Sequence, residues 1–207
     1  MEDVHNLFFI SGPHGSGKTT LLDALQGRDD KILLPELYSR TIKFETQPFD
    51  RLILKLCGRV IENFECLEIA RNNPERIIIG NRCVYDQEVY ARVYHKRGWI
   101  DEEELNLTWG LRQDAFLEAI TTPRAIVLNP GYESVKRHLE KRWSEGKKKW
   151  HEDDEQYTLL ACKEYEALHG RDNVLYLDHE IDLRDTFEVE RITGWIYEHC
   201  GLERQLV

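Results

Sequence analysis

Long hydrophobic runs are absent from this sequence of 207 residues. The most apolar stretches, at 7–10, 77–79 and 125–128, are far shorter than the roughly 20 residues that a helix needs to span a bilayer. The first residues, MEDVHN, are acidic, whereas signal peptides and mitochondrial presequences are basic at this point. We therefore expect a cytoplasmic protein with no membrane partner.

Cysteine is scarce and irregularly placed. The five cysteines form no C-x-x-C pair, and the eight histidines show no spacing typical of a metal site. An odd number of scattered cysteines indicates reduced thiols rather than a disulfide framework. The sequence thus predicts no metal centre built from cysteine and histidine.

Basic residues are outnumbered. There are 28 Lys and Arg against 38 Asp and Glu, which gives a formal net charge of −10. Because binding to phosphate backbones needs a basic face, a long nucleic acid is an unfavourable partner. With 41% hydrophobic residues, no repeat and no linker-like segment, the chain suits one α/β domain.

Short apolar runs alternate with helix-like segments, which is typical of a parallel sheet covered by helices. We expect five strands, at 7–11, 31–35, 76–80, 125–129 and 173–178. We expect helices at 18–26, 49–72, 132–143, 155–168 and 186–199. A further helix opens with a capping box of Asp101 and Glu104 and carries Leu105, Trp109 and Phe116 inward.

One motif carries specific chemistry. The first strand runs into G-x-x-x-x-G-K-T, the pattern of a phosphate-binding loop between a strand and a helix. The backbone amides of such a loop converge on an anion, and the dipole of the following helix adds to the attraction. Lys18 reaches the β and γ phosphates and the Thr19 hydroxyl holds Mg²⁺. We therefore predict that ATP or GTP binds at Gly12, Pro13, His14, Gly15, Ser16, Gly17, Lys18 and Thr19.

Two polar residues follow expected strand ends, where ligands bind in parallel sheets, and a third precedes the long helix. Glu36 is a candidate proton acceptor for an acceptor hydroxyl, with a solvated loop carboxylate as the alternative. Gln47 carries an amide that pairs with a nucleobase edge, or is simply a polar surface residue. Arg82 follows the third strand and neutralises charge on a transferring phosphoryl group.

The segment 141–154, KRWSEGKKKWHEDD, is too charged to be core. Arg137, Lys141 and Arg142 precede or open it on one helix, and Gly146 offers a pivot. Such a basic segment suits a lid that closes over phosphates, with a solvated helix end as the alternative.

Taken together, these features resemble the deoxyribonucleoside kinase family over almost the whole chain, with thymidylate kinase as a neighbouring relative. Pro35-Glu36 resembles the family's Glu-Pro step, and FETQ at 44–47 is similar to its Phe-x-x-Gln. NRCVY at 81–85 resembles its Glu-Arg-Ser segment, and NVLYLD at 173–178 its last strand. The resemblance implies a P-loop NTPase fold of three α/β/α layers with a five-stranded parallel sheet of order 2-3-1-4-5. It implies one kinase domain over 1–207, a short basic lid near 141–154, and a homodimer.

The resemblance also implies a reaction. The γ-phosphate of ATP, bound with Mg²⁺, moves to the 5′-hydroxyl of a nucleoside or deoxynucleoside. Glu36 is then the general base, and Gln47 reads the nucleobase. Lys18 and Arg82 spread the transition-state charge, while Arg137 and Arg142 belong to the lid.

Three departures from the family pattern keep other functions open. Asn81 and Asn129 stand where the family has acidic residues, which weakens magnesium coordination unless Glu36 or Asp86 supplies the charge. They favour, as one alternative, a nucleotide-binding protein or weak ATPase without transfer activity. Pro35 replaces the arginine of thymidylate kinases and favours a nucleoside acceptor. The alternative of a nucleoside monophosphate kinase rests on Arg40 and Lys43, and a 5′-hydroxyl kinase for oligonucleotides is a further one.

Overall fold

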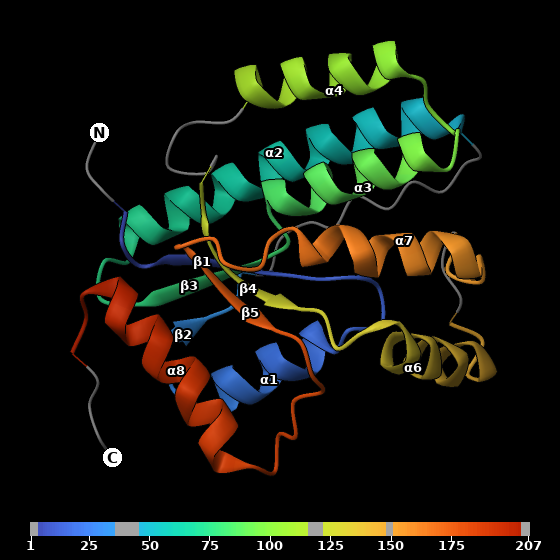
Figure 1. Cartoon of the computed structure of the whole chain (residues 1–207). Helices are drawn as coiled ribbons and strands as arrows, with labels where there is room; N and C mark the ends of the chain where they lie inside the picture. The colour runs from blue at the N-terminus through green and yellow to red at the C-terminus, as the bar shows by residue number, and fades with distance from the viewer. Residues whose placement is uncertain (1–3, 36–45, 116–121, 148–150, 204–207) are drawn as a thin grey trace.

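The computed structural model describes residues 4–35, 46–115, 122–147 and 151–203. Its centre is a five-stranded sheet in the order β2-β3-β1-β4-β5, and all neighbouring strands are parallel (Figure 1). The strands are β1 Leu7–Ser11, β2 Ile32–Leu33, β3 Ile77–Asn81, β4 Arg124–Leu128 and β5 Val174–Leu177. The predicted α/β class and strand order are confirmed.

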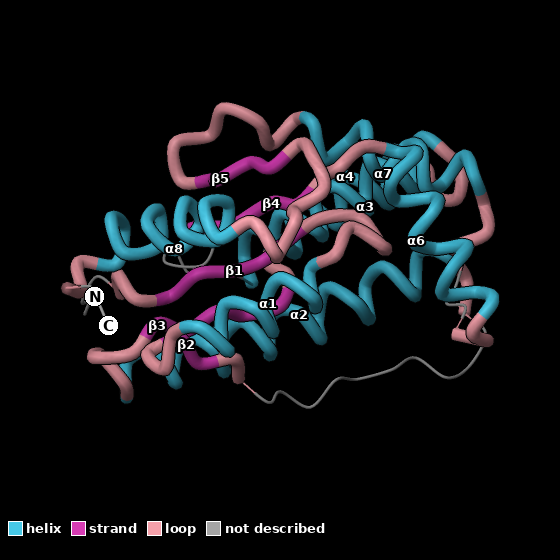
Figure 2. The backbone as a smooth tube through the Cα atoms, turned by 90° about the horizontal axis from the view of Figure 1, so that it is seen from below, coloured by secondary structure: helices cyan, strands magenta, loops and turns pink. Residues whose placement is uncertain are grey.

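Helices cover both faces of the sheet. On one face lie α1 Lys18–Arg28 and α8 Thr186–Cys200, which pass in front of the strands in Figure 2. On the other face lie α2 Pro48–Asn72, α3 Val84–Lys96 and α7 Glu155–Glu166 (Figure 1). Helix α4 Glu102–Ala115 packs outside α2 and α3, and α6 Tyr132–Ser144 lies beside α7.

The two faces of the strands explain the three layers. In β1, Leu7 and Phe9 belong to the core under α2, α3 and α7. Phe8 and Ile10, which point the other way, belong to the core over α1 and α8. A strand that is apolar on both faces is stable only when both are covered, which the near-continuous hydrophobic runs predicted.

Two elements differ from the sequence-based expectation. The second strand is shorter than 31–35 because Pro35 has no N–H to continue the ladder. Helix α3 was not predicted at all. It opens with an unusual capping box, in which the Cys83 side chain and the Asp86 carboxylate exchange bonds with the backbone. Most of its residues are buried, including the polar residues Asp86, Gln87 and Glu88, which interrupt the apolar pattern of the sequence.

The helix with the Asp101–Glu104 capping box is α4, and both bonds of the box are present. Leu105 is buried and Trp109 packs against the core, as predicted, whereas Phe116 lies outside the described residues. Within the described ranges, no helix has both the length and the apolar character that crossing a bilayer requires.

Candidate active site

The loop after β1 has the geometry of a phosphate cradle. Gly12 has φ +143°, and a Cβ there would lie 2.1 Å from the carbonyl oxygen of Leu128, so the position requires glycine. Gly17 is left-handed at φ +92° and immediately precedes α1. No side chain caps the start of α1. The first amides of this helix therefore face the cavity as donors for an anion.

Lys18 lies at the centre of the loop. Its ammonium donates to the carbonyl oxygens of Gly12 at 2.9 Å and Pro13 at 2.6 Å, and to the Ser16 hydroxyl at 3.1 Å. The side chain is buried, so its charge acts in a region of low dielectric. These bonds hold the ammonium where the β and γ phosphates of a bound nucleotide would lie.

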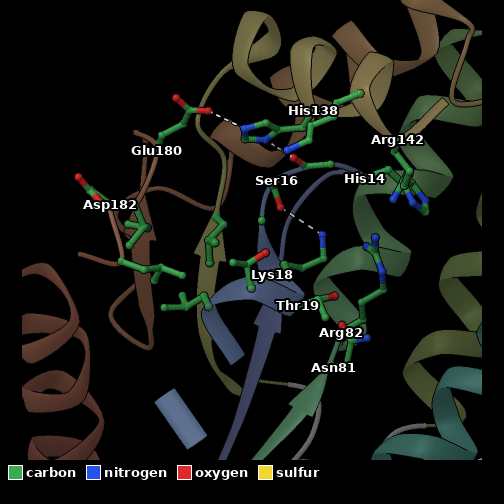
Figure 3. A pocket seen from close by; sticks show the side chains of 18 of the residues that line it. His14, Ser16, Lys18, Thr19, Asn81, Arg82, His138, Arg142, Glu180 and Asp182 are labelled. Atoms are coloured by element: carbon green, nitrogen blue, oxygen red, sulfur yellow. Dashed lines mark hydrogen bonds and ion pairs between the residues drawn. The ribbon is translucent and has the colours of Figure 1, made fainter. Parts of the chain in front are cut away.

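A cavity of about 850 Å³ opens over this loop (Figure 3). Five cationic side chains line it, Lys18, Arg82, Lys141, Arg142 and Arg184, against two carboxylates, Glu180 and Asp182. The chain as a whole carries a net charge of −10, so this concentration of positive charge is local. The cavity is therefore suited to a strongly anionic ligand of nucleotide size.

Arg82 closes the side of the cavity next to β3. Its backbone has φ +71°, which is uncommon for a non-glycine residue and is held by a 2.7 Å bond from its N–H to the Ile10 carbonyl. Its guanidinium donates to the carbonyl oxygen of Gly12 at 3.2 Å and contacts the Asp86 carboxylate. The arginine is thus tied to the phosphate loop itself.

Asp86 holds Arg82 in place. Its carboxylate is buried and accepts bonds from the Ser11 hydroxyl at 2.6 Å, the Cys83 N–H at 3.0 Å and the Tyr165 hydroxyl at 2.5 Å. Burial alone would raise its pKa, but Arg82 and the two hydroxyls keep the pKa of Asp86 below its usual value. Because these groups occupy the carboxylate, its role here is to orient Arg82.

The predicted lid helix contacts the loop on the opposite side. Lys141 and Arg142 line the cavity. Arg137 instead pairs with Glu180 at 2.7 Å, and the same carboxylate oxygen lies 2.7 Å from His138 Nε2. His138 Nδ1 lies 2.8 Å from the Gly15 carbonyl. Helix α6, the loop after β5 and the phosphate loop are therefore joined at one point.

The other predicted site residues are distributed unevenly. Asn81 lines the cavity, whereas Gln47 is exposed directly before α2. Asn129 is buried, and its amide donates to the Cys162 carbonyl at 2.9 Å and the Tyr176 hydroxyl at 2.7 Å. Glu36, Arg40 and Lys43 lie outside the described residues.

Magnesium is compatible with the residues present. Two side chains that line the cavity offer an oxygen atom as a metal ligand. Thr19 follows the phosphate-loop lysine, and Asn81 ends β3. Among the described residues, no group of three or more His, Cys, Asp or Glu side chains is arranged to hold a metal ion. Mg²⁺ is usually bound by one or two protein oxygens together with substrate phosphates and waters, so such a group is not required.

Sequence reasoning missed several residues that shape the cavity: His138, Glu152, Tyr165, Glu180 and Asp182. One signal was available for Glu180 and Asp182. They follow β5, and the carboxyl ends of parallel strands meet at the same edge of the sheet. The contacts of the other three join segments far apart in the chain, and no local pattern predicts them.

His14 makes the stability of the protein sensitive to acid. Burial lowers the pKa of His14 to about 4, below its ordinary value of 6.5. Between these two values the unfolded chain binds a proton that the folded protein excludes, so the free energy of unfolding falls as the pH falls. Replacement by asparagine removes this titration. Acidification from about pH 7 to pH 5 should lower the free energy of unfolding of both proteins. We expect the loss in His14→Asn to be smaller than in wild type by about 1 kcal/mol, which corresponds to about 2–4 °C in melting temperature.

The measurement is thermal unfolding followed by circular dichroism across that pH range. Equal losses of melting temperature in the two proteins would contradict a neutral imidazole with a lowered pKa at position 14.

Comparison with solved structures places the fold. The chain is similar to deoxyadenosine kinase from M. mycoides with bound dATP, with a TM-score of 0.66 and 16% identity over 91% of this chain and 98% of that one. The same enzyme with bound dCTP gives a TM-score of 0.66 and 17% identity over 93% and 99%. The structure of that enzyme with the products dCMP and a flexible dCDP gives a TM-score of 0.67 and 16% identity over 93% of this chain and 99% of that one. No protein-family model matches this sequence, and comparison with curated proteins finds no match. The chain therefore has the P-loop kinase fold of these structures.

Proposed function

We propose that this protein transfers the γ-phosphate of ATP to the 5′-hydroxyl of a nucleoside or deoxynucleoside. The observation that carries the proposal is the cavity over the phosphate loop, where five cations surround a nucleotide-sized space in an acidic protein. The likeness to a deoxyadenosine kinase, which covers more than nine tenths of both chains, supports the same reaction class.

We orient the ATP donor in the cavity by the charge and polarity of the residues that line it. Its phosphates lie against the loop amides and Lys18, between Arg82 and Arg142 (Figure 3). Its base lies toward Ile181 and Leu183 of the loop after β5, which give the far wall an apolar character. Thr19 and Asn81 would hold Mg²⁺, which would neutralise charge that develops on the phosphates.

The chemical step is a direct displacement. Glu36 accepts the proton of the 5′-hydroxyl, and the sugar oxygen forms a bond to the γ phosphorus. The bond from that phosphorus to the bridging oxygen breaks, and ADP leaves. Lys18 and Arg82 stabilise the charge on the transferring group, which is the main source of catalysis in phosphoryl transfer.

A row of cations on α2 favours a second candidate, a nucleoside monophosphate kinase. Arg51, Lys55 and Arg59 are spaced by four residues and share one face of the helix. Arg59 Nη1 pairs with Glu62 at 2.6 Å and reaches the carbonyl oxygen of Arg82 at 3.5 Å, so the row ends beside Arg82. Burial, and then the charges of Arg51, Arg59 and Arg82, lower the pKa of Lys55. An acceptor that carries a phosphate would relieve this repulsion.

An acceptor panel tests both candidates. Purified protein is incubated with Mg²⁺ and γ-labelled ATP, with nucleosides, their 5′-monophosphates and short 5′-hydroxyl oligonucleotides in parallel. The proposal predicts labelled nucleoside monophosphate, and label in a diphosphate would establish the second candidate. An ATP analogue that binds while no acceptor is labelled would contradict both, and would indicate a nucleotide-binding protein.

One pair of variants tests the role of the cations on α2 in binding a monophosphate acceptor. If the acceptor is a monophosphate, Lys55→Gln raises its KM by about tenfold, because one ion pair to phosphate is lost. Lys163→Gln, which removes an exposed charge on α7, is the matched control. An unchanged KM for the monophosphate in Lys55→Gln would show that the cations on α2 do not bind the acceptor phosphate.

A further inference from the structure

One fully buried carboxylate outside the reaction described above joins the lid to the phosphate loop. Glu152, in the turn before α7, has a side chain that is 0% exposed. Its Oε1 lies 3.2 Å from Nδ1 of His14 and contacts the guanidinium of Arg142. Because a buried charge is costly unless it is paired, its partners are what keep Glu152 in this position.

The two partners come from two separate segments of the chain. His14 belongs to the loop that cradles the phosphates, and Arg142 lies near the end of α6. Both line the cavity, and Figure 3 shows them side by side above Lys18 and Arg82. The same carboxylate therefore fixes a lid cation at the wall of the donor site and links it to the loop.

The protonation states suit this link at neutral pH. Burial lowers the pKa of His14 to about 4, so its ring is neutral, and its Nδ1 lies 3.2 Å from Oε1 of the carboxylate. Burial alone would raise the pKa of Glu152, but the bonds from His14 and Arg142 lower it to about 2. The carboxylate is therefore an anion across the physiological range.

Arg142 keeps donor capacity for a ligand. Its side chain lines the cavity and is 26% exposed, so part of it remains accessible to a ligand beside its contact with Glu152. A phosphate oxygen in the cavity would accept a hydrogen bond from this accessible part of the side chain.

We infer that Glu152 is a positioning residue, which holds Arg142 toward the donor phosphates and links this arginine to the phosphate loop through His14. The inference rests on the proposed function only in taking a nucleoside triphosphate as the donor. It requires no particular acceptor. Loss of the carboxylate frees Arg142 to rotate, so donor affinity falls more than the rate of the chemical step.

The test is the affinity for a non-hydrolysable ATP analogue with Mg²⁺, measured by calorimetry on the full chain. We expect Glu152→Gln to weaken binding by about 10- to 100-fold, as for loss of one charge-assisted contact. The matched control is Glu145→Gln, which removes an exposed glutamate from the same segment that pairs with Lys147 at 2.9 Å. Glu145→Gln should bind as wild type does. Wild-type affinity in Glu152→Gln would overturn the inference.

A double-mutant cycle separates positioning from a merely structural role. If Glu152 acts through Arg142, the double variant Glu152→Gln/Arg142→Gln binds the analogue about as Arg142→Gln does alone. Additive losses would overturn the inference. Where an acceptor is turned over, KM for ATP should rise while kcat changes little, and Glu152→Asp should restore part of the affinity.

A second cycle does not depend on folding of Glu152→Gln. His14 and Arg142 are linked here through Glu152, so His14→Ala and Arg142→Gln should be non-additive in analogue affinity. Additivity would overturn the inference. Binding of the analogue is measured without an acceptor. A protein that binds the analogue but phosphorylates no acceptor would therefore contradict the proposed function and leave the inference about Glu152 intact.

Discussion

Lys18→Ala is expected to reduce ATP-dependent phosphoryl transfer by about 10³-fold or more. The ammonium is held by three oxygens of the loop and is buried at the floor of the cavity. Its positive charge therefore lies where negative charge develops on the β and γ phosphates. Alanine removes that charge and leaves no group able to replace it. The measurement is initial rate with γ-labelled ATP and the best acceptor of the panel.

Lys163→Ala is the matched control for this variant, because it removes an exposed lysine of α7. Thermal unfolding checks that Lys18→Ala remains folded, and the Gly12 carbonyl oxygen that it leaves still accepts a bond from Arg82 at 3.2 Å. A folded Lys18→Ala protein that transfers phosphate at the wild-type rate would remove the phosphate loop from the mechanism.

Glu36→Gln is expected to lower kcat by about 10²- to 10⁴-fold with little change in KM for ATP. Glu36 follows β2, which pairs with β3 in parallel and ends at the same edge of the sheet as the phosphate loop. The amide is nearly isosteric but cannot accept the hydroxyl proton. The measurement is kcat against pH, where the acidic limb of the wild-type profile should be lost in the variant.

An exposed glutamate outside the site, Glu75, supplies the control variant Glu75→Gln. Normal turnover by Glu36→Gln would show that another group takes the proton. In that case the donor site described above would stand, and the assignment of the base would be wrong.

Local sequence patterns predicted the parts of the protein that depend on near neighbours. The phosphate loop follows from glycine positions that the backbone requires, as at Gly12, where a Cβ would meet the Leu128 carbonyl at 2.1 Å. The sheet follows from runs such as β1, in which residues of both faces are apolar. The strand order came from the resemblance to nucleoside kinases, since spacing alone does not determine which strands are neighbours.

Contacts between distant segments could not be predicted in the same way. Asp86 was considered as a source of charge for magnesium, yet it is occupied by Arg82, Ser11 and Tyr165. Helix α3 was missed because the buried polar residues Asp86 and Gln87 interrupt its apolar pattern. Arg137 was expected over the donor and instead pairs with Glu180. In each case the outcome depends on which element packs alongside, which a local pattern does not encode.

The most direct test of the donor site is a crystal structure of the protein with a non-hydrolysable ATP analogue and Mg²⁺. The account predicts the β phosphate within hydrogen-bond distance of the amides of residues 15–19, the γ phosphate between Lys18, Arg82 and Arg142, and the base against Ile181 and Leu183. An analogue bound elsewhere, with these amides and cations making no contact to phosphate, would contradict it.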